Sequence, residues 1–225
     1  MRPAAVIFDL DGTLVDSRAD LAAAANHVRI ALGRPTLPAE VVLGFVGDGA
    51  RMLLRRTLAH VDDPIRPPAA PSEADIDQAY AIFAAHYSAH LLDHTVLYPG
   101  MAELLRRLAP RPLFLATNKP REFTLPLVNG LGLGDVFAAV VAGDDVERRK
   151  PHPDHLLSCL AGFDLDPTAC AMVGDSPNDI LPARDLGMRS VALTWGLVEE
   201  DRLAAAGPDH LVHDAAGLAA ALQSD

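Results

Sequence analysis

The sequence of 225 residues contains little lysine and carries few positive charges for its length. Only Lys119 and Lys150 are lysines, and the other basic residues are all arginines. The 19 basic residues are outnumbered by 30 acidic ones, which gives a formal net charge of −11. Because a protein that binds nucleic acid normally carries a basic face, this balance disfavours a nucleic-acid partner. Scarce lysines either mark positions that need a compact ammonium or are ordinary surface residues, and composition alone favours the surface interpretation.

Cysteine and long apolar runs are also scarce. The two cysteines, Cys159 and Cys170, form neither a disulfide framework nor a metal-ligand spacing, so we expect buried free thiols in a reducing compartment. No stretch approaches the apolar length that crosses a bilayer, and a β-rich run begins too early for a cleavable signal segment to precede it. We therefore expect a cytoplasmic protein without a membrane partner.

Nucleotide-binding motifs are missing as well. No GxxxxGK[ST] sequence occurs, which disfavours a P-loop enzyme. The glycines of Gly130–Gly134 lack GxGxxG spacing and follow a predicted helix, so we interpret them as a helix end and a loop.

What the sequence does contain is a series of short apolar runs, each typical of a buried strand in a parallel sheet. These runs are Ala4–Phe8, Pro112–Ala116, Ala138–Ala142, Ala171–Val173 and Val191–Leu193. The helical patterns that lie between them are Met101–Leu108, Glu122–Gly130, His155–Ala161 and Asn178–Leu186. Alternating strands and helices predict an α/β fold, a doubly wound parallel sheet with a Rossmann-like core.

The first two predicted strands are separated by about a hundred residues, far more than one crossover needs. The helical patterns in this interval are Ala19–Leu32, Glu40–Val46, Ala50–Leu58 and Ala74–Leu92, with a proline-rich loop at Pro64–Pro71. We therefore predict a helical cap subdomain, residues 16–92, inserted into a core made of residues 1–15 and 93–225.

Polar residues follow four of the predicted strands. Ligands bind outside the carboxyl ends of the strands in a doubly wound sheet, so we expect these side chains to meet at one edge. They are Asp9, Asp11, Thr117, Asn118, Lys150, Asp175 and Asp179.

Together these groups match the needs of phosphoryl transfer. Asp9 is a candidate nucleophile because carboxylates form acyl-phosphates, and Asp11 is a candidate acid/base. Thr117 and Asn118 can donate hydrogen bonds to phosphate oxygens, while Lys150 can neutralise the nucleophile and the transferred group. A hard divalent cation would take oxygen ligands from Asp9, a carbonyl near Asp11, and a carboxylate from the later strand.

Each motif also has a purely structural interpretation. An Asp-x-Asp-Gly sequence after a strand is frequent in turns, and Gly-Asp-Ser is a common start of a helix. Their joint occurrence at several strand ends favours the catalytic interpretation. His86, His90 and His94, at four-residue spacing on a predicted helix, are interpreted as solvated or partly packed rather than as metal ligands.

The motifs resemble those of the haloacid dehalogenase-like hydrolase superfamily. The segments that carry this resemblance are Asp9–Thr13, Thr117-Asn118, Lys150-Pro151 and Gly174-Asp175 followed by Asp179. The resemblance implies that Asp9 is the nucleophile and Asp11 the acid/base. It also implies that Mg²⁺ is bound by Asp9, Asp175 and the backbone carbonyl of Asp11, with Asp179 supporting the metal site. In this family the helical cap closes over the substrate and excludes water.

A closer resemblance is to the phosphoglycolate phosphatases. The segments that carry it are Thr117–Pro120, Gly143–Val146, Lys150–Pro153, Gly174–Ile180 and Val46–Ala50. It implies hydrolysis of 2-phosphoglycolate, a small phosphorylated metabolite. We expect either a monomer or a homodimer, and the sequence does not decide between them. Phosphatases of N-acetylmuramate 6-phosphate share much of this core, so another small phosphometabolite stays open as the substrate.

Three other functions are compatible with a fold of this kind, and the motifs disfavour each of them. A phosphomutase similar to β-phosphoglucomutase would pass the phosphoryl group to a sugar, but the insertion shows no sugar-handling signature. A metal-free dehalogenase is disfavoured by Asp11, since that branch needs no acid/base carboxylate at this position. A binding module without chemistry is disfavoured because none of the motifs is degraded.

Overall fold

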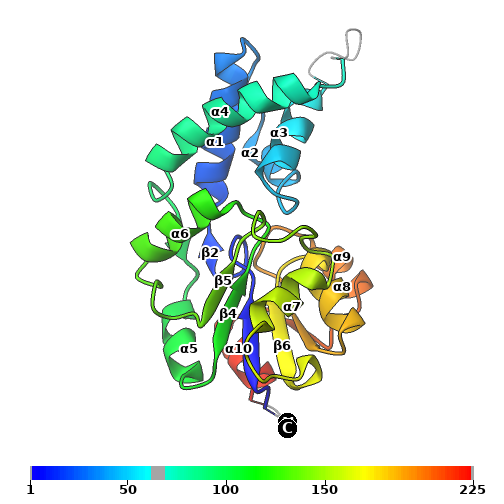
Figure 1. Ribbon diagram of the computed structural model, residues 1–225. Helices are drawn as coiled ribbons and strands as arrows, with labels where there is room; N and C mark the ends of the chain where they lie inside the picture. The colour runs from blue at the N-terminus through cyan, green and yellow to red at the C-terminus, as the bar shows by residue number, and fades with distance from the viewer. Residues whose placement is uncertain (1, 62–68, 224–225) are drawn as a thin grey trace. The chain divides into compact units, whose positions relative to one another are not determined.

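The computed structural model describes residues 2–61 and 69–223 (Figure 1). The chain forms two compact units, one made of Met1–Asp16 with Val96–Asp225 and the other of Ser17–Thr95. The predicted boundaries, 16–92 for an inserted cap, differ from these units by a few residues, and the assignment as a cap stays a prediction. Of the predicted loop Pro64–Pro71, residues 64–68 lie outside the described residues.

The larger unit contains a six-stranded sheet with the order β5-β4-β1-β6-β7-β8, in which every neighbouring pair is parallel. The strands are β1 (Ala5–Phe8), β4 (Leu113–Ala116), β5 (Ala139–Val141), β6 (Cys170–Gly174), β7 (Arg189–Leu193) and β8 (His210–Val212). The predicted α/β fold with a doubly wound parallel sheet is confirmed. Five of the strands coincide with the predicted runs, and the sixth, β8, is a three-residue edge strand that the sequence pattern did not indicate.

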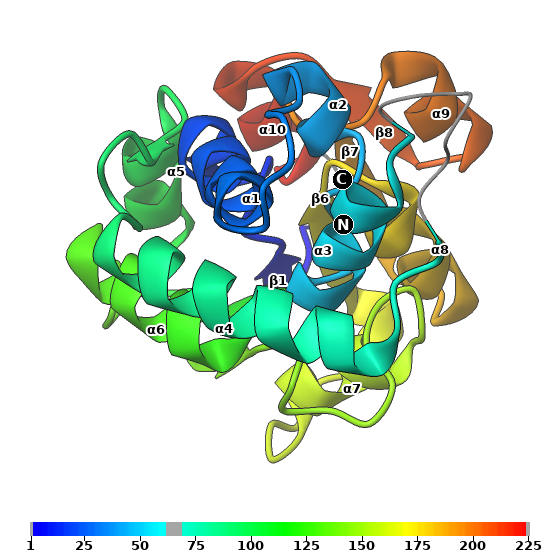
Figure 2. The ribbon, with the colours of Figure 1, turned by 90° about the horizontal axis from the view of Figure 1, so that it is seen from above.

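Helices cover both faces of this sheet, which explains why the strands are apolar on both sides. Figure 2 shows α5 (Met101–Leu108) and α10 (Ala215–Ala221) on one side of the sheet and α7 (Asp154–Leu160) on the other. The remaining helices of this unit are α6 (Arg121–Gly130), η1 (Pro167–Ala169), α8 (Pro177–Asp185) and α9 (Glu200–Ala205). Side chains of α7 and α8 pack with alternate residues of β1, β4 and β6 in one buried cluster.

A short antiparallel pair lies where the chain leaves and re-enters the larger unit. Val15 and Asp16 form β2, which pairs with β3, formed by Val96 and Leu97. Strands of two residues show no periodicity, so they could not be read from the sequence.

Both cysteines are buried free thiols, as expected. Burial raises the pKa of the Cys159 thiol to about 12, so this group is an inert part of the core. Within residues 2–61 and 69–223, no helix has both the length and the apolar character needed to span a membrane.

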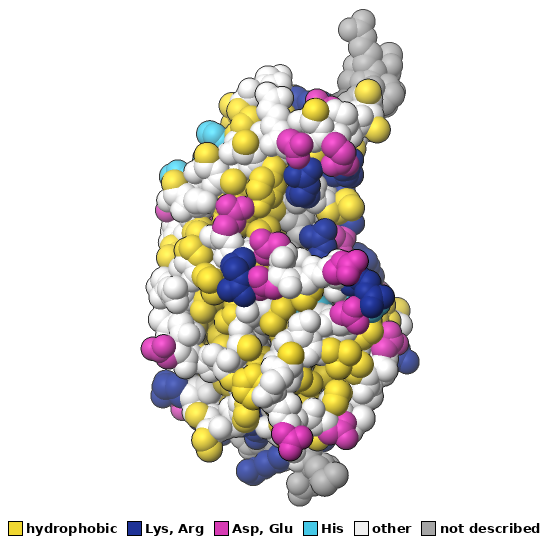
Figure 3. All heavy atoms as spheres, viewed as in Figure 1, with side chains coloured by type: hydrophobic (Ala, Val, Ile, Leu, Met, Phe, Trp, Pro, Cys, Tyr) yellow, Lys and Arg dark blue, Asp and Glu magenta, His cyan; other side chains and the backbone are white. Residues whose placement is uncertain are grey.

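Charged side chains on the face drawn in Figure 3 are interspersed, with Lys and Arg lying among Asp and Glu. Several of the arginines make exposed ion pairs, such as Arg51 with Asp77 at 2.7 Å and Arg148 with Asp154 at 2.6 Å. Such pairs contribute little to stability because water screens them.

The smaller unit consists of α1 (Arg18–Ala31), α2 (Ala39–Leu43), α3 (Ala50–Ala59) and α4 (Glu73–Ala89), which correspond to the four predicted helices. α2 ends three residues earlier than predicted, and Gly44 follows it directly. α4 also ends early, so His94 does not lie on the helix and the predicted histidine face is wrong. Instead, the ring of His86 lies between those of His27 and His90, with centroid distances of 4.1 and 4.4 Å, so these histidines are partly packed.

The last residues of this unit are tied to its first helix by Asp20. This carboxylate is buried, and its Oδ2 accepts hydrogen bonds from the backbone nitrogens of His94 (3.0 Å) and Thr95 (2.8 Å) and from the Thr95 hydroxyl (2.7 Å). One carboxylate oxygen therefore satisfies three donors that have little access to water.

We predict that Asp20→Ala lowers the free energy of unfolding by about 2–3 kcal/mol, because three donors to a charged oxygen lose their acceptor. Urea denaturation followed by circular dichroism measures this change. Asp77→Ala is the matched control, since its side chain is 67% exposed and pairs only at the surface. Equal stability of the two variants would show that the Asp20 hydrogen bonds do not hold this unit together.

Candidate active site

The predicted site residues emerge at the centre of the sheet, where β1 lies between β4 and β6. The parallel register pairs Phe8 with Leu115 on one side and with Val173 on the other. The residues that follow these three positions therefore leave the sheet at the same edge. This is also the place where the strand order reverses, which is where open α/β sheets bind ligands.

The Lys150 side chain makes three contacts at this edge. Its ammonium donates to Asp9 Oδ1 at 2.8 Å, to Asp179 Oδ1 at 2.6 Å and to the backbone oxygen of Ala116 at 2.6 Å. Only 2% of the Lys150 side chain is exposed. Burial by itself lowers the pKa of Lys150, but Asp179 and Asp9 outweigh it, so the pKa is raised and the ammonium stays charged.

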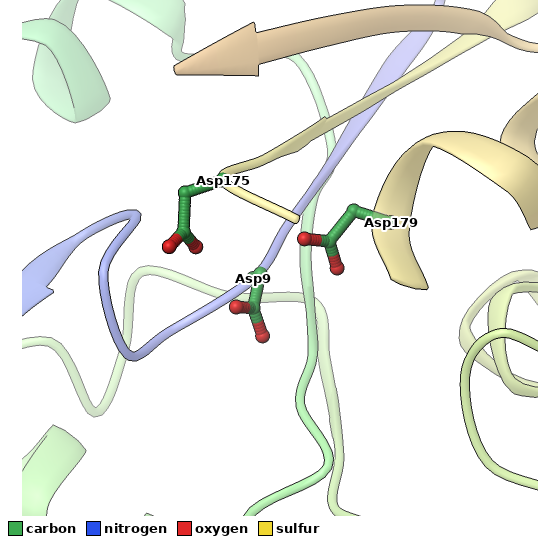
Figure 4. A group of neighbouring side chains, drawn as sticks. All are labelled: Asp9, Asp175 and Asp179. Atoms are coloured by element: carbon green, nitrogen blue, oxygen red, sulfur yellow. The ribbon is translucent and has the colours of Figure 1, made fainter. Parts of the chain in front are cut away.

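Three carboxylates converge beside this ammonium, those of Asp9, Asp175 and Asp179 (Figure 4). One ligand oxygen of each lies within 4.8 Å of the others. Burial raises the pKa of Asp9 to about 7 in spite of Lys150, and burial together with Asp9 and Asp179 raises the pKa of Asp175. Since one ammonium cannot offset three buried carboxylates, the donor set fits a hard divalent cation that prefers oxygen ligands.

Asp175 and Asp179 are held in place by specific hydrogen bonds. Asp175 accepts from the Thr13 hydroxyl at 2.9 Å and from the backbone nitrogen of Leu197 at 2.7 Å. Asp179 accepts from the backbone nitrogen and hydroxyl of Ser176, at 3.1 and 3.0 Å, and this contact also caps the start of α8. The two carboxylates are therefore oriented before any ligand arrives.

The glycines of both acidic motifs are required because these carboxylates lie against the backbone. Gly12 has φ +86°, and a Cβ at this position would collide with the Asp175 carboxylate. A Cβ on Gly174 would collide with the carboxylate of Asp179. The glycines of both acidic motifs thus make room for the acidic cluster rather than only forming turns.

Asp11 does not join the three-carboxylate cluster. Both of its oxygens accept from the Lys119 ammonium, at 3.1 and 3.0 Å, and the two side chains are 13% and 4% exposed. Both lysines of the chain are therefore buried in ion pairs at the candidate site, and their interpretation as surface residues was wrong.

The residues predicted as phosphate donors are also buried at this edge. The Thr117 hydroxyl accepts from the backbone nitrogen of Lys119 at 3.2 Å, which leaves its hydrogen for another acceptor. Asn118 donates from its amide nitrogen to the backbone oxygen of Lys150 at 2.9 Å, so it helps to position that lysine. Direct binding of phosphate by Thr117, Asn118 and Lys150 stays a prediction.

His155 is a further residue of the site that the sequence did not single out. Its Nδ1 accepts from the backbone nitrogen of Lys150 at 3.2 Å, so Nε2 carries the hydrogen and donates to the backbone oxygen of Val141 at 3.1 Å. Burial, and then the nearby Lys150 ammonium, lower the pKa of His155 to about 4. A neutral, buried imidazole therefore holds the backbone of Lys150.

Comparison with known proteins identifies the family of the chain. Residues 6–193 match the family model of haloacid dehalogenase-like hydrolases. The chain belongs to this family. It is thus a hydrolase, and the resemblance inferred from the motifs is confirmed.

Curated relatives of the chain bear the name phosphoglycolate phosphatase. The one from Chromobacterium violaceum is 40% identical over 89% of both chains, and the one from Escherichia coli K12 is 36% identical over 91% of this chain and 86% of its own. Among solved structures, a predicted phosphoglycolate phosphatase from Haemophilus somnus is 29% identical over 94% of each chain, with a TM-score of 0.87. A haloacid dehalogenase-like family protein from Streptococcus pneumoniae is 27% identical over 97% of this chain and 98% of its own, with a TM-score of 0.82.

The lowered pKa of His155 predicts a loss of stability in acid. Unfolded histidine titrates near 6.5, so the unfolded chain takes up this proton before the folded chain does. The contribution of neutral His155 is fully present above that pH and is lost as the pH falls towards about 4, by on the order of 3 kcal/mol. Urea denaturation between pH 7.5 and pH 4.5 measures it.

In His155→Gln this acid-dependent component should disappear, since the amide offers a donor and an acceptor but does not titrate. His213→Gln is the control, because the His213 side chain is 64% exposed. If the wild type and His155→Gln lose stability in parallel as the pH falls, His155 is not the group responsible.

Proposed function

We propose that the chain is a Mg²⁺-dependent phosphatase that forms a phospho-aspartate on Asp9 and hydrolyses 2-phosphoglycolate to glycolate and phosphate. The observation that carries this proposal is the convergence of Asp9, Asp175 and Asp179 within 4.8 Å, beside a buried lysine that contacts Asp9. The names of the relatives at 36–40% identity support the substrate. The helical unit Ser17–Thr95 is proposed to be the cap of this family.

In the proposed reaction one oxygen of Asp9 attacks the phosphorus of the ester. Lys150 binds Oδ1, which leaves Oδ2 as the attacking atom. A bond forms between this oxygen and phosphorus, the bond from phosphorus to the ester oxygen breaks, and Asp11 supplies the proton that the departing alkoxide needs. Water then attacks the phosphorus of the acyl-phosphate while Asp11 takes up a proton from the water. The bond from phosphorus to Asp9 breaks, which releases phosphate and regenerates the Asp9 carboxylate.

The other residues at this edge offset charge during both steps. Lys150 remains charged and stabilises the negative charge that accumulates between Asp9 and the phosphoryl group. Asp9, Asp175 and the backbone carbonyl of Asp11 would hold Mg²⁺, and Asp179 would support the site from its contact with Lys150. When bound, the cation supplies Lewis-acid stabilisation of the phosphate oxygens.

We predict that phosphate release from 2-phosphoglycolate requires Mg²⁺ and is lost when EDTA removes it. Asp9→Asn should reduce kcat by at least about a thousandfold, because an amide does not form the acyl-phosphate. Asp11→Asn should also be severely impaired, although a good leaving group would still allow phospho-enzyme to accumulate. The matched control is Asp185→Asn, which alters an exposed carboxylate at the end of α8.

The panel of substrates should include N-acetylmuramate 6-phosphate and glucose 1-phosphate. Full activity of Asp9→Asn would exclude the covalent mechanism. Faster release of phosphate from N-acetylmuramate 6-phosphate would exclude 2-phosphoglycolate as the preferred substrate. Bisphosphate-dependent isomerisation of the hexose phosphate that outpaces phosphate release would identify a phosphomutase instead.

A further inference from the structure

Asp175 is held by groups that come from the strands on both sides of its own. It directly follows β6, which lies between β1 and β7 in the sheet. On the β1 side, the Thr13 hydroxyl donates to Asp175 Oδ1 at 2.9 Å. On the β7 side, the backbone nitrogen of Leu197 donates to Asp175 Oδ2 at 2.7 Å. Each oxygen of this buried carboxylate therefore accepts a hydrogen bond, and an ionised carboxylate oxygen has a second lone pair that a cation can use.

The Asp175 side chain is also confined by the backbone on both sides. A Cβ on Gly12 would lie 2.2 Å from Asp175 Oδ2, and a Cβ on Gly196 would lie 2.2 Å from Asp175 Cβ and 2.3 Å from Oδ2. Gly12 belongs to the first acidic motif, whereas Gly196 lies in the segment after β7, outside the acidic motifs. The carboxylate thus lies between two glycine backbones that leave it little freedom to turn.

Trp195 connects these two sides across the end of β6. Its indole Nε1 donates to the backbone oxygen of Thr13 at 3.4 Å. Its ring meets that of Tyr98 in an edge contact, with 6.1 Å between the centroids, and the backbone nitrogen of Tyr98 donates to the backbone oxygen of Leu14 at 3.0 Å. Trp195 is therefore tied to the chain that follows β1, although β1 and β7 are not neighbours in the sheet.

We propose that Trp195 is a positioning residue, which holds the segment Trp195–Leu197 against Asp175 and thereby raises the affinity of the site for Mg²⁺. This inference rests on the proposed function, since it takes Asp175 as a ligand of that cation. The segment lies between β7 and α9 and belongs to neither, so its own contacts determine its position. A carboxylate that is already oriented loses less conformational freedom when a cation binds, and groups behind metal ligands therefore influence affinity.

The orientation of Asp175 has to be maintained against electrostatic repulsion. Oxygens of Asp9, Asp175 and Asp179 lie within 4.8 Å of one another, so the ionised carboxylates repel one another when no cation is bound. The Lys150 ammonium binds Asp9 and Asp179. The hydroxyl and the backbone nitrogen that bind Asp175 are neutral, so they fix this carboxylate without removing the negative charge that attracts a cation.

A simpler alternative is that Trp195 only packs the ends of the strands together. A residue with this role contributes to the stability of the fold, and its loss lowers kcat at every concentration of Mg²⁺. A residue that orients a metal ligand changes the affinity for Mg²⁺, and its loss is overcome when the concentration of Mg²⁺ is raised.

The test measures Mg²⁺ binding to the substrate-free protein by isothermal titration calorimetry. Trp195→Phe keeps an aromatic ring but removes the N–H donor, so we expect the Kd of Mg²⁺ to rise about 3- to 10-fold as one hydrogen bond is lost. In Gly196→Ala the added Cβ displaces Asp175, and the Kd should rise on the order of 10- to 100-fold. Thr194→Val is the matched control, because it removes from the neighbouring position a hydroxyl that pairs with His213 at 2.9 Å; its Kd should stay within about twofold of the wild-type value.

Phosphate release from 2-phosphoglycolate gives a second readout. In Trp195→Phe the Mg²⁺ concentration for half-maximal activity should rise by the same factor as the Kd, whereas kcat at saturating Mg²⁺ should stay within about threefold of the wild-type value. Urea denaturation without Mg²⁺ checks that each variant is folded. Trp195→Phe decides the test if Gly196→Ala does not fold.

The outcomes separate this inference from the proposed function. If the wild type binds no Mg²⁺, the proposed function fails. If the wild type binds Mg²⁺ and folded Trp195→Phe binds it with the same Kd, the proposed function stands and the inference is overturned. A Kd that rises as much in Thr194→Val as in Trp195→Phe would equally overturn it, and so would a kcat of Trp195→Phe that saturating Mg²⁺ does not restore.

Discussion

The buried ammonium of Lys150 connects the parts of the molecule on which the candidate site depends. Its three N–H donors bind Asp9 after β1, the backbone oxygen of Ala116 at the end of β4 and Asp179 on α8. Its own backbone is fixed through Asn118 and His155. Two strands and two helices thus meet at one charge, and losing Asp9 or Asp179 would leave the buried ammonium with less compensation.

This ammonium compensates only part of the negative charge that collects around it. Asp9, Asp175 and Asp179 lie together with one cation among them, and burial raises the pKa of Asp9 to about 7. The same excess of negative charge that destabilises the folded protein creates affinity for a divalent cation, because a bound cation stabilises only the folded arrangement. Thr13 and the backbone of Leu197 fix the orientation of Asp175, and Ser176 fixes that of Asp179. Protein groups therefore orient the carboxylates, but they do not neutralise all of the negative charge at the site.

The α/β class and the location of the site could be predicted because both follow from strongly patterned parts of the sequence. Buried parallel strands are continuous apolar runs, and the polar residues after them necessarily emerge at one edge. The remaining features of the fold and the site could not be predicted because they have no periodic sequence pattern. Strands β2, β3 and β8 are too short to show periodicity, and α4 ends before His94, whose backbone nitrogen donates to Asp20. His155 carried no signal at all, since an imidazole that holds a backbone nitrogen looks like any other histidine in a helix.

The scarcity of lysine was visible in the sequence, but composition alone did not show that Lys119 lies at the candidate site. In a chain whose other basic residues are arginine, the two lysines lie within the candidate site and form ion pairs with different carboxylates. Lys150 contacts Asp9, the proposed nucleophile, whereas Lys119 contacts Asp11, the proposed acid/base. An ammonium is compact and can direct its donors to partners on different elements, which a planar guanidinium does less readily, so lysine suits both buried positions.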